Sequence, residues 1–381
     1  MVQLGAAYRQ AGRSAEARWL LERALARRPD NALTALYLGL TYEDQGDLGR
    51  ARELYTRYVE AEAAPGMRDV QRRIRARLPL LARRELEAAV RSAIAREAEL
   101  AGTEPAASRV AVFPFLYGGA DPELRPLGRA LAELLATDLS QVQRVTVLER
   151  ARVQLLLDEL ALADSGYVDP ATAARSGRLL GAGRIVQGRI AGGADALRLE
   201  AAVVRAGTGE AVGGAVREED ELRRLFDMEK RLALALFESL GVQLTPAERE
   251  RVNRRPTQSL QALLEYGLGL EAEDAGDYAR AAAHYGRAEA ADPGFAEART
   301  RREGAEGAAA AVRETTAQLS ALASAAAGFG AAAPASIEID QVLQQLPAFD
   351  GRDAAAEILG REGIGRRSVI EIILRPPTVR Q

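Results

Sequence analysis

The chain has 381 residues, of which 48% are hydrophobic and 28% charged, as in soluble globular proteins of two or three domains. It has no cysteine and one histidine, which excludes disulfides, thiolate nucleophiles, zinc–thiolate sites, iron–sulfur clusters and any histidine-rich metal site within one chain. The formal net charge of −3 provides no global field that would favour nucleic acid or an anionic membrane.

Residues 1–64 contain two copies of a pattern with a period of 34, and each copy has a glycine-containing turn near its middle. The pattern resembles the tetratricopeptide (TPR) repeat, a pair of antiparallel helices that cross closely at small residues. We therefore expect two TPR repeats here. The first copy begins at the fourth position of the motif, which predicts that part of its first helix precedes Met1. The resemblance implies a repeat framework and a candidate partner-binding surface that include Tyr8, Leu38, Gly39, Tyr42, Tyr55 and Tyr58.

Residues 65–105 are predicted to be a basic helical connector. Between Arg68 and Arg96 there are nine arginines against three acidic residues, and apolar residues keep helical spacing on both sides of a break expected at Pro79. We interpret the segment as an amphipathic helix with a solvated basic face. A contact with lipid headgroups, nucleic acid or an acidic partner is the alternative. No aromatic residues alternate with the arginines, which argues against stacking on single strands.

Residues 106–245 predict one compact α/β domain. The run Val110–Phe115 predicts a strand, and a helix with leucines at helical spacing begins near Leu127. Pro170 after Asp169 marks the start of a later helix. The expected order is strand, helix, strand, helix, helix, three strands and helix, and hairpins connect most of the sheet. The strands are expected at 110–115, 145–148, 184–190, 197–204 and 210–216, and the last helix at about 220–240.

The glycines of this domain do not form a nucleotide-binding motif. Gly118-Gly119 follows the first strand, but a third glycine is missing at the required spacing and seven residues separate the pair from the next helix. Gly181-Ala182-Gly183 precedes a strand, which is the wrong context, and the chain has no Gly-Lys-Ser/Thr sequence. We therefore predict no nucleotide cofactor and interpret these glycines as turn and helix-end residues.

An ordered set of motifs over about Ser108–Gly241 resembles the curli-secretion (CsgG-type) family. The set includes Val110-Ala-Val-Phe-Pro-Phe115, Val147-Leu-Glu-Arg150 and a Gly-Ala pair before a strand that ends in Gln187-Gly188. Gly183 departs from the aspartate that is usual in the family. The residues of this sequence that carry the resemblance include Pro114, Gly128, Arg129, Glu149, Arg150, Gly166, Gly181 and Gly188.

The resemblance implies an envelope-associated α/β domain that tends to assemble into rings. Channel-forming members insert membrane-spanning hairpins, which need two strands of about 9–11 residues each. The tight turns expected at Ala191–Ala196 and Arg205–Thr208 leave no room for such strands, so the resemblance transfers the fold and the tendency to assemble rather than the pore. The family's lipid-anchor cysteine has no counterpart. For Glu149 and Arg150 we favour a structural ion pair or a helix-start carboxylate over a catalytic acid.

Residues 246–302 carry a third TPR-like copy, which adds Tyr285 to the predicted framework. His284 lies in the second helix of this copy and is interpreted as a surface or packing residue. It is not expected to be catalytic or a metal ligand, because nothing near it supplies a nucleophile or a second metal ligand. Residues 303–381 combine an Ala-rich helical stretch with a C-terminal strand segment. The uncharged stretch 315–337 is interpreted as a small-residue packing helix or a linker rather than a bilayer span. The apolar run Val369–Leu374 is expected to dock on the middle sheet or to reach another copy by strand addition.

These patterns predict an α+β multidomain protein in which helical TPR repeats flank a compact CsgG-like α/β domain. We expect a non-enzymatic cell-envelope scaffold that binds protein partners and forms a homo-oligomer or ring. It would be periplasmic or outer-membrane-associated, touching the envelope peripherally, with no membrane span and no nucleic acid partner. The alternative is a ring-forming component of an outer-membrane secretion or transport complex of the curli type. No catalytic, cofactor-binding or metal-binding residue is predicted.

Overall fold

The computed structural model describes residues 1–62, 66–100, 102, 105–161, 170–314, 318, 319, 321 and 322. The chain forms two compact units, one comprising Met1–Leu81 together with the chain from Ala310 onward, and the other Ala82–Ala309. The predicted strand segment at 369–374, together with Asp169 and Gly166, lies outside the described residues.

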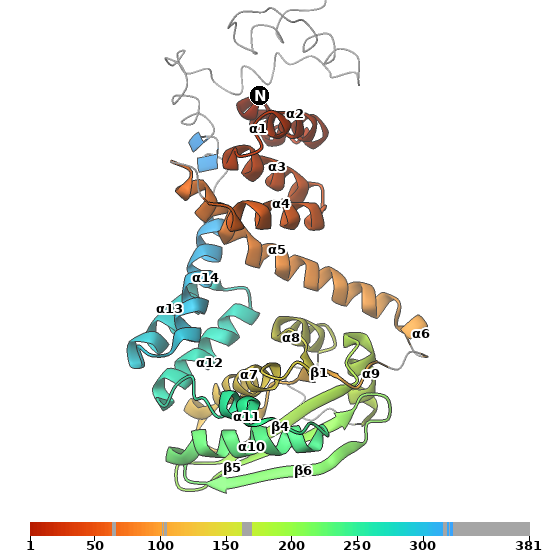
Figure 1. The fold of residues 1–381 in the computed structure, drawn as a ribbon, viewed down its shortest axis with the longest axis vertical. Coiled ribbons are helices and arrows are strands. Elements are labelled where there is room, and N and C mark those ends of the chain that lie inside the picture. The colour runs from red at the N-terminus through yellow and green to blue at the C-terminus, as the bar shows by residue number, and fades with distance from the viewer. Residues whose placement is uncertain are drawn as a thin grey trace, which may run out of the picture. The chain divides into compact units, whose positions relative to one another are not determined.

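Four helices form the N-terminal part of the first unit: α1 (Val2–Gln10), α2 (Ser14–Arg27), α3 (Ala32–Asp44) and α4 (Leu48–Glu60) (Figure 1). They pack as two helix hairpins, α1 with α2 and α3 with α4, around one hydrophobic core. Gly12 and Gly46 end the first helix of each hairpin at φ +73° and +75°, a left-handed conformation that glycine adopts without strain. The turn glycines of the sequence pattern therefore reverse the chain in both copies.

Helix α5 (Arg68–Ala95) continues through Pro79, so the predicted break there is wrong. Proline removes one backbone donor and strains the preceding turn, which costs a helix about 3 kcal/mol. The flanking side chains supply a compensating contact, because Leu81 is fully buried in the core of the first unit and Leu78 packs against it. The boundary between the two units falls within this helix, after Leu81.

Within the described part of the second unit, six strands form a mixed sheet with the order β3-β1-β4-β5-β6, and β2 also pairs with β4. Strands β1 and β3 are parallel to each other, and β1 and β2 are parallel to β4, whereas β4, β5 and β6 form an antiparallel meander. The strands are β1 (Arg109–Val112), β2 (Leu116–Tyr117), β3 (Thr146–Val147), β4 (Arg184–Gly192), β5 (Leu197–Arg205) and β6 (Ala211–Asp220).

The sequence predicted one strand at 110–115, but β1 ends at Val112, and the short strand β2 begins only after the predicted run, at Leu116. The Phe113 amide still donates to the Val186 carbonyl, whereas Pro114 has no N–H with which to continue the ladder. The Phe115 amide then donates to the Gly128 carbonyl, outside the sheet. The last predicted strand also differs, since β6 continues to Asp220 and the following helix begins only at Leu225.

Helices cover the sheet on two faces, as the alternation of strand side chains requires. Val110 and Val112 point into a core with α7 (Leu127–Ser140) and α10 (Leu225–Ser239). Figure 1 shows α10 lying along β5 and β6. Ala111 and Phe113 point the other way, into a core with α8 (Arg150–Glu159), α9 (Pro170–Leu180) and the end of α5. Short helical elements lie between these, namely α6 (Glu97–Leu100), η1 (Pro122–Leu124) and η2 (Leu222–Arg224).

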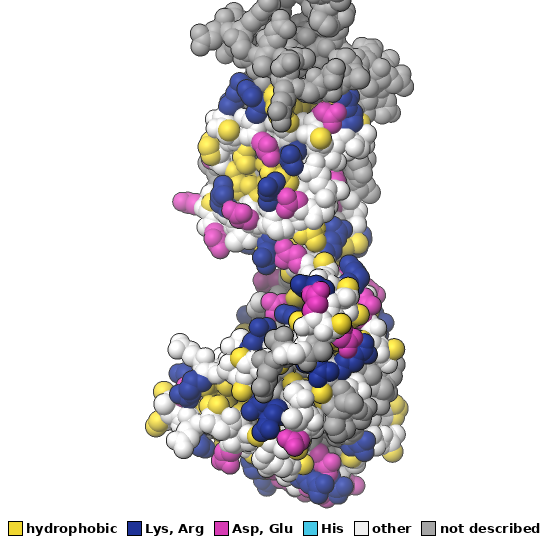
Figure 2. Space-filling model, turned by 90° about the vertical axis from the view of Figure 1, so that its right-hand side faces the viewer, with side chains coloured by type: hydrophobic (Ala, Val, Ile, Leu, Met, Phe, Trp, Pro, Cys, Tyr) yellow, Lys and Arg dark blue, Asp and Glu magenta, His cyan; other side chains and the backbone are white. Residues whose placement is uncertain are grey.

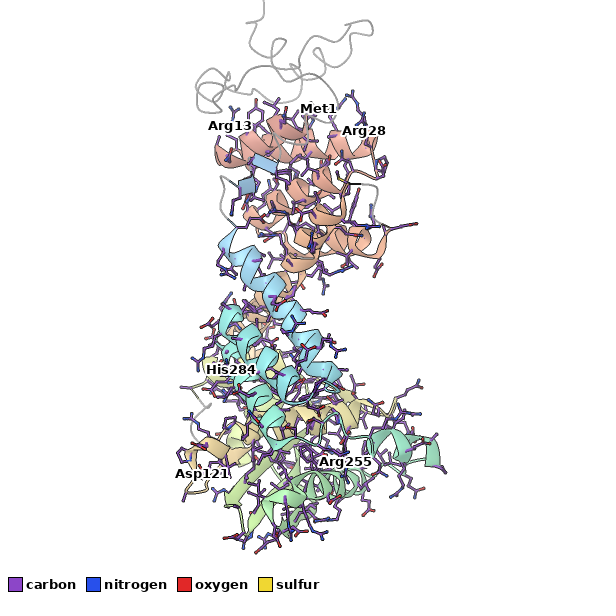
Figure 3. The ribbon with its side chains drawn as sticks, turned by 90° about the vertical axis from the view of Figure 1, so that its left-hand side faces the viewer. Met1, Arg13, Arg28, Asp121, Arg255 and His284 are labelled. Atoms are coloured by element: carbon purple, nitrogen blue, oxygen red, sulfur yellow. The ribbon has the colours of Figure 1, made fainter. Side chains whose placement is uncertain are left out.

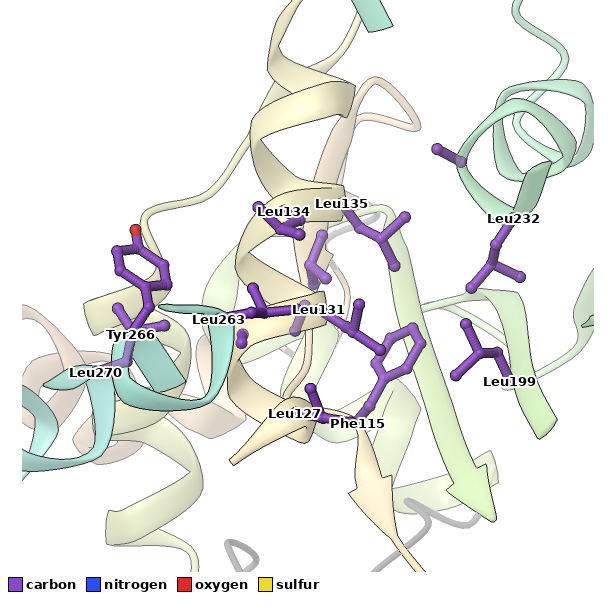
Figure 4. Close-up of a cluster of buried hydrophobic side chains, with 14 of the residues drawn as sticks. Phe115, Leu127, Leu131, Leu134, Leu135, Leu199, Leu232, Leu263, Tyr266 and Leu270 are labelled. Carbon is purple, nitrogen blue, oxygen red and sulfur yellow. The ribbon is translucent and has the colours of Figure 1, made fainter. Parts of the chain in front are cut away.

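The second unit ends in α11 (Pro246–Val252), α12 (Leu260–Asp274), α13 (Tyr278–Ala291) and α14 (Ala296–Arg313). Helix α12 packs directly on α7, and the core that begins at the sheet continues through α7 into α12 and α13. In Figure 4, α7 lies between Leu263 and Tyr266 of α12 on one side and Leu199 of β5 on the other. Helix α7 is therefore buried on both sides and joins the sheet to the α12–α13 hairpin. Among the helices that the structure describes, none has the length and apolar character needed to cross a membrane.

Candidate functional site

Six charged side chains meet where α12 approaches the first turns of α7 and α8. Three of them are arginines and three are carboxylates, so their formal charges balance. They come from α7 (Arg129, Glu133), α8 (Arg150), the end of α12 (Glu273, Asp274) and α14 (Arg301). We call this group the ion-pair network.

Asp274 is the centre of the network. Its carboxylate accepts from Arg129 Nε at 3.0 Å and also from Arg150. Arg150 in turn lies 3.6 Å from carboxylate oxygens of both Glu133 and Glu273. Only 6% of the Asp274 side chain and 14% of the Arg150 side chain is exposed, so these charges depend on one another rather than on water.

Arg301 closes the network from α14. Its Nη1 donates to Glu273 at 3.0 Å, its Nε donates to the Tyr266 hydroxyl at 2.9 Å, and it also pairs with Glu133. Burial raises the pKa of Tyr266 to about 12, so its hydroxyl stays protonated. Burial also raises the pKa of Asp274 in spite of its two arginines, whereas at Glu273 the effect of burial is outweighed by Arg301 and Arg150, which lower the pKa.

Helix ends explain why these charges need one another. Asp274 is the last residue of α12, where the carbonyl ends of the helix disfavour an anion. Arg150 is the first residue of α8, where the amide ends disfavour a cation. Their direct contact offsets both penalties. Arg83 of α5 adds two hydrogen bonds, at 3.2 and 2.9 Å, to the carbonyls of Glu273 and Asp274 at the same helix end.

A cavity of about 10 Å³ adjoins the network, lined among others by Pro114, Arg129, Arg150 and Asp274. A cavity of this size holds at most about one water molecule. Three residues that carry the family resemblance, Pro114, Arg129 and Arg150, therefore lie beside a packed ion pair with space for about one water molecule.

Three other motif glycines, Gly128, Gly181 and Gly188, shape the backbone of the domain. A Cβ at Gly128 would collide with the Phe115 carbonyl, and one at Gly188 would collide with the Phe115 ring, so both glycines make room for that residue. Gly181 follows α9 at φ +66°, where glycine is favoured. Glu149 precedes α8 and makes no side-chain capping bond.

The residues of the helix hairpins repeat one arrangement. The ring of Tyr55 on α4 lies over Gly39 of α3, and the ring of Tyr285 on α13 lies over Gly269 of α12. The hydroxyl of Tyr55 donates to Glu43 at 2.9 Å, and Arg77 of the following helix donates two bonds to the same carboxylate. In the second unit Tyr285 and Arg301 bond Glu273 in the same way. Glycine, glutamate and tyrosine are each displaced by 230 residues between the two hairpins.

Most of the predicted partner-binding residues are internal. Tyr8, Tyr55 and Tyr285 are at most 1% exposed, so their side chains build the hairpins and offer no surface. Leu38, Tyr42 and Tyr58 are also largely buried, but they line a groove between α2, α3 and α4. Whether any of these residues contacts a partner stays a prediction.

His284 lies on α13, where its Nδ1 is 2.8 Å from a carboxylate oxygen of Glu265, and Arg287 contacts the same nitrogen (Figure 3). Arg287 also donates to the same Glu265 carboxylate at 2.9 Å, so the three side chains contact one another on the α12–α13 hairpin. Among the described residues, no group of three or more metal-ligating side chains gathers.

Sequence reasoning missed the acidic half of the network and a second buried cluster, Asp138 of α7 with Glu229 and Lys230 of α10. Lys230 is the only lysine of the chain and lies within a helix with an apolar face, which was the one available signal. Asp274 lies 145 residues from Arg129 and 124 residues from Arg150 in sequence, and no local pattern indicates that it pairs with them.

Three comparisons with known proteins gave one match to a family model. Residues 108–222 match the family model of the curli production assembly/transport component CsgG. No curated protein sequence matches the chain. Among solved structures, the C-terminal domain of LpoB from Salmonella enterica is similar, with 16% sequence identity, coverage of 32% of this chain and 86% of that one, and a TM-score of 0.26. The match to the CsgG family model thus covers the strands β1 to β6 and the helices between them, with further helices on both sides.

Proposed function

We propose that the protein is a non-enzymatic scaffold of the bacterial cell envelope that works through protein–protein contacts. The observation that carries this proposal is that two charged motif residues, Arg129 and Arg150, form ion pairs with the end of a helix. Arg129 and Arg150 bind the end of α12 and enclose space for about one water molecule. A domain whose motif residues fix a helix hairpin in place is suited to presenting that hairpin to another protein.

We interpret the hairpins as TPR repeats. The period of 34, the left-handed glycine in each turn and the tyrosine over a small residue support this interpretation. Repeats of this kind bind other chains through their helical surfaces. The family match points to the envelope, and we propose the periplasm or the periplasmic side of the outer membrane as the location.

A ring-forming component of a curli-type export complex is the second candidate, and one observation favours it. Strand β6 ends the sheet, so its outer edge has no partner strand within the described part of the chain. An open edge of this kind pairs readily with another chain.

Cell fractionation combined with cross-linking tests the scaffold proposal. An epitope-tagged full-length chain should be recovered with the envelope and should cross-link to protein partners there. A matched chain with Arg150→Met and Arg129→Met keeps the tag and the location but loses the ion pairs that hold α12, and should lose cross-links made through α12–α14. Recovery in the cytosol without cross-linked partners would contradict the proposal.

A further inference from the structure

The first unit has a groove of about 450 Å³ between α2, α3 and α4, which we call the α2–α4 groove. Figure 2 shows an apolar patch bordered by basic and acidic side chains over the N-terminal helices. The groove lies wholly within described residues of one unit. Its lining residues include Leu25, Ala26, Leu38 and Leu54 on the floor, with Arg50, Glu53 and Arg57 at the rim.

Two hydrogen bonds mark the ends of the groove. At one end the Tyr42 hydroxyl donates to Glu22 of α2 at 3.0 Å, and at the other the Tyr58 hydroxyl donates to the Pro29 carbonyl. Between these ends, the rim of α4 runs from Arg50 to Arg57, two helical turns, or roughly 10 Å. The floor therefore accepts three or four residues of an extended chain, which advances about 3.3 Å per residue.

The rim carries charges that are only weakly paired. Arg50 and Arg57 are 60% and 67% exposed, and the nearest carboxylates, at 3.4 and 3.8 Å, belong to Asp47 and Glu53 of the same helix. Exposed pairs of this type contribute little to stability, because water screens the charges and holding two long side chains in place costs entropy. The arginines can therefore turn to an incoming carboxylate, and Glu53, which is 76% exposed, can turn to an incoming cation.

One segment of the chain matches the groove in polarity and charge, and it is slightly longer than the part of the groove between Arg50 and Arg57. In Val369–Leu374, residues Ile370, Ile372 and Leu374 alternate, so an extended conformation places all three on one face over about 13 Å. Glu371 lies between them on the opposite face. Arginines flank the run at 366, 367 and 375, which suits the glutamates of the groove.

The segment also starts from the right unit. Leu319 is buried in the core of the first unit, and its carbonyl accepts from the Tyr37 hydroxyl of α3. The 46 residues between Leu322 and Val369 can span many times the roughly 20 Å length of α4.

We propose that the α2–α4 groove binds Val369–Leu374 of its own chain. Ile370, Ile372 and Leu374 rest on the apolar floor, and Glu371 faces Arg50 and Arg57. The C-terminal segment then covers this surface in the free protein, and an external partner must displace it. This inference concerns an intramolecular contact and holds whether or not the envelope function is correct.

Introduced cysteines test the contact in the full-length protein, because the natural chain has none. In a Glu53→Cys/Ile373→Cys variant, both substitutions leave the floor and the apolar face of the segment intact. A short bis-maleimide should link the two cysteines within one chain, as a linked peptide found by mass spectrometry in the monomer band. The control pairs Ile373→Cys with Arg52→Cys, whose position lies on the far side of α4, and should give at least fivefold less product.

A third variant adds Ile372→Asp to the Glu53/Ile373 pair. This change lies in the C-terminal segment, so it leaves the helices unaltered, and it should reduce the yield to that of the Arg52 control. Equal yields at positions 52 and 53 would overturn the proposal, as would a yield insensitive to Ile372→Asp. A product that forms only between two chains and disappears on dilution would overturn it in favour of binding by a second copy.

Discussion

Glu229 and Lys230 are neighbouring residues of α10 that are both buried beneath the surface of the second unit. Lys230 Nζ lies 2.7 Å from Asp138 of α7 and 3.3 Å from Glu229, so one ammonium group serves two carboxylates. Neither carboxylate oxygen of Glu229 has a hydrogen-bond partner among the described residues. Burial, and then the charge of Asp138, raises the pKa of Glu229 well above its usual range. Glu229 is therefore harder to ionise than an exposed glutamate.

The raised pKa of Glu229 makes the stability of the fold depend on pH. Because the pKa is higher in the folded than in the unfolded chain, the folded state binds more protons between the two values, and stability is lost as pH rises through that window, by up to about 1.4 kcal/mol per pH unit. Glu229→Gln keeps the shape without the titration. We predict that the melting temperature falls as the pH rises above the ordinary pKa of glutamate in the natural chain and falls less in this variant.

Glu238→Gln is the matched control, since that residue is exposed on the same helix and should leave the pH profile unchanged. Parallel profiles for the natural chain and Glu229→Gln would show that Glu229 ionises normally.

Gly269 is required by the ring that covers it. A Cβ at this position would overlap the Tyr285 ring, so Gly269→Ala should destabilise the protein by about 1–3 kcal/mol in spite of the better helix propensity of alanine. Gly304 in α14 has no atom within 4 Å of such a Cβ, and Gly304→Ala should stabilise by about 0.5–1 kcal/mol. Urea denaturation of both variants measures this contrast, and a stabilised Gly269→Ala protein would contradict the packing described here.

At the scale of elements, the ion-pair network is what attaches α12 to α7 and α8 beyond their apolar contacts. Arg150→Met removes the charge that faces Asp274, Glu133 and Glu273, and leaves three carboxylates with two arginines. Breaking a buried pair on one side costs about 3–5 kcal/mol. We predict a loss of this size in the free energy of unfolding.

Arg144→Met is the control variant for the loss in free energy of unfolding that we predict for Arg150→Met. Arg144 is 53% exposed and pairs with Glu248, so its removal should cost at most about 1 kcal/mol. Combining Arg150→Met with Asp274→Asn should recover part of the loss, because the second change removes the carboxylate left unpaired. Additive losses would mean that the two residues do not interact.

The elements that could be predicted from sequence are those with local signals. Glycine and aspartate turns separate β4, β5 and β6, and the hairpins α1–α4 and α12–α13 follow a fixed spacing of glycine and bulky residues. The end of the first strand before Pro114 could also have been predicted from the missing donor of that proline. The continuity of α5 through Pro79 could not, because it depends on the burial of Leu81 and on the packing of Leu78 in the core of the first unit.

The site was only half predictable. Arg129 and Arg150 could be singled out by motif, but their partner Asp274 lies in a helix 124 residues beyond Arg150. No local sequence pattern near Arg129, Arg150 or Asp274 indicates that the end of α12 meets the start of α8. That pairing follows from α12 packing on α7, which depends on the whole core of the second unit.

At the scale of the whole molecule, the scaffold and the ring differ in how many copies assemble. Strand β6 has ten residues, ends the sheet and is exposed along most of its length. An open edge of this length is a site for pairing with another chain. We therefore predict that the full-length protein forms a homo-oligomer at micromolar concentration without lipid or detergent, measured by sedimentation velocity against the 40.8 kDa chain mass.

A charged residue on the edge strand tests where the copies meet. Ala215→Lys places an ammonium group in the middle of β6, and an edge lysine opposes pairing with a further strand. Ala194→Lys adds the same charge to the exposed turn between β4 and β5 and serves as the control. If Ala215→Lys alone yields monomers, the β6 edge is the contact and a ring built through the sheet gains support. If the natural chain is already monomeric, the ring loses its structural basis, and a scaffold that acts as a single copy through its helix hairpins is favoured instead.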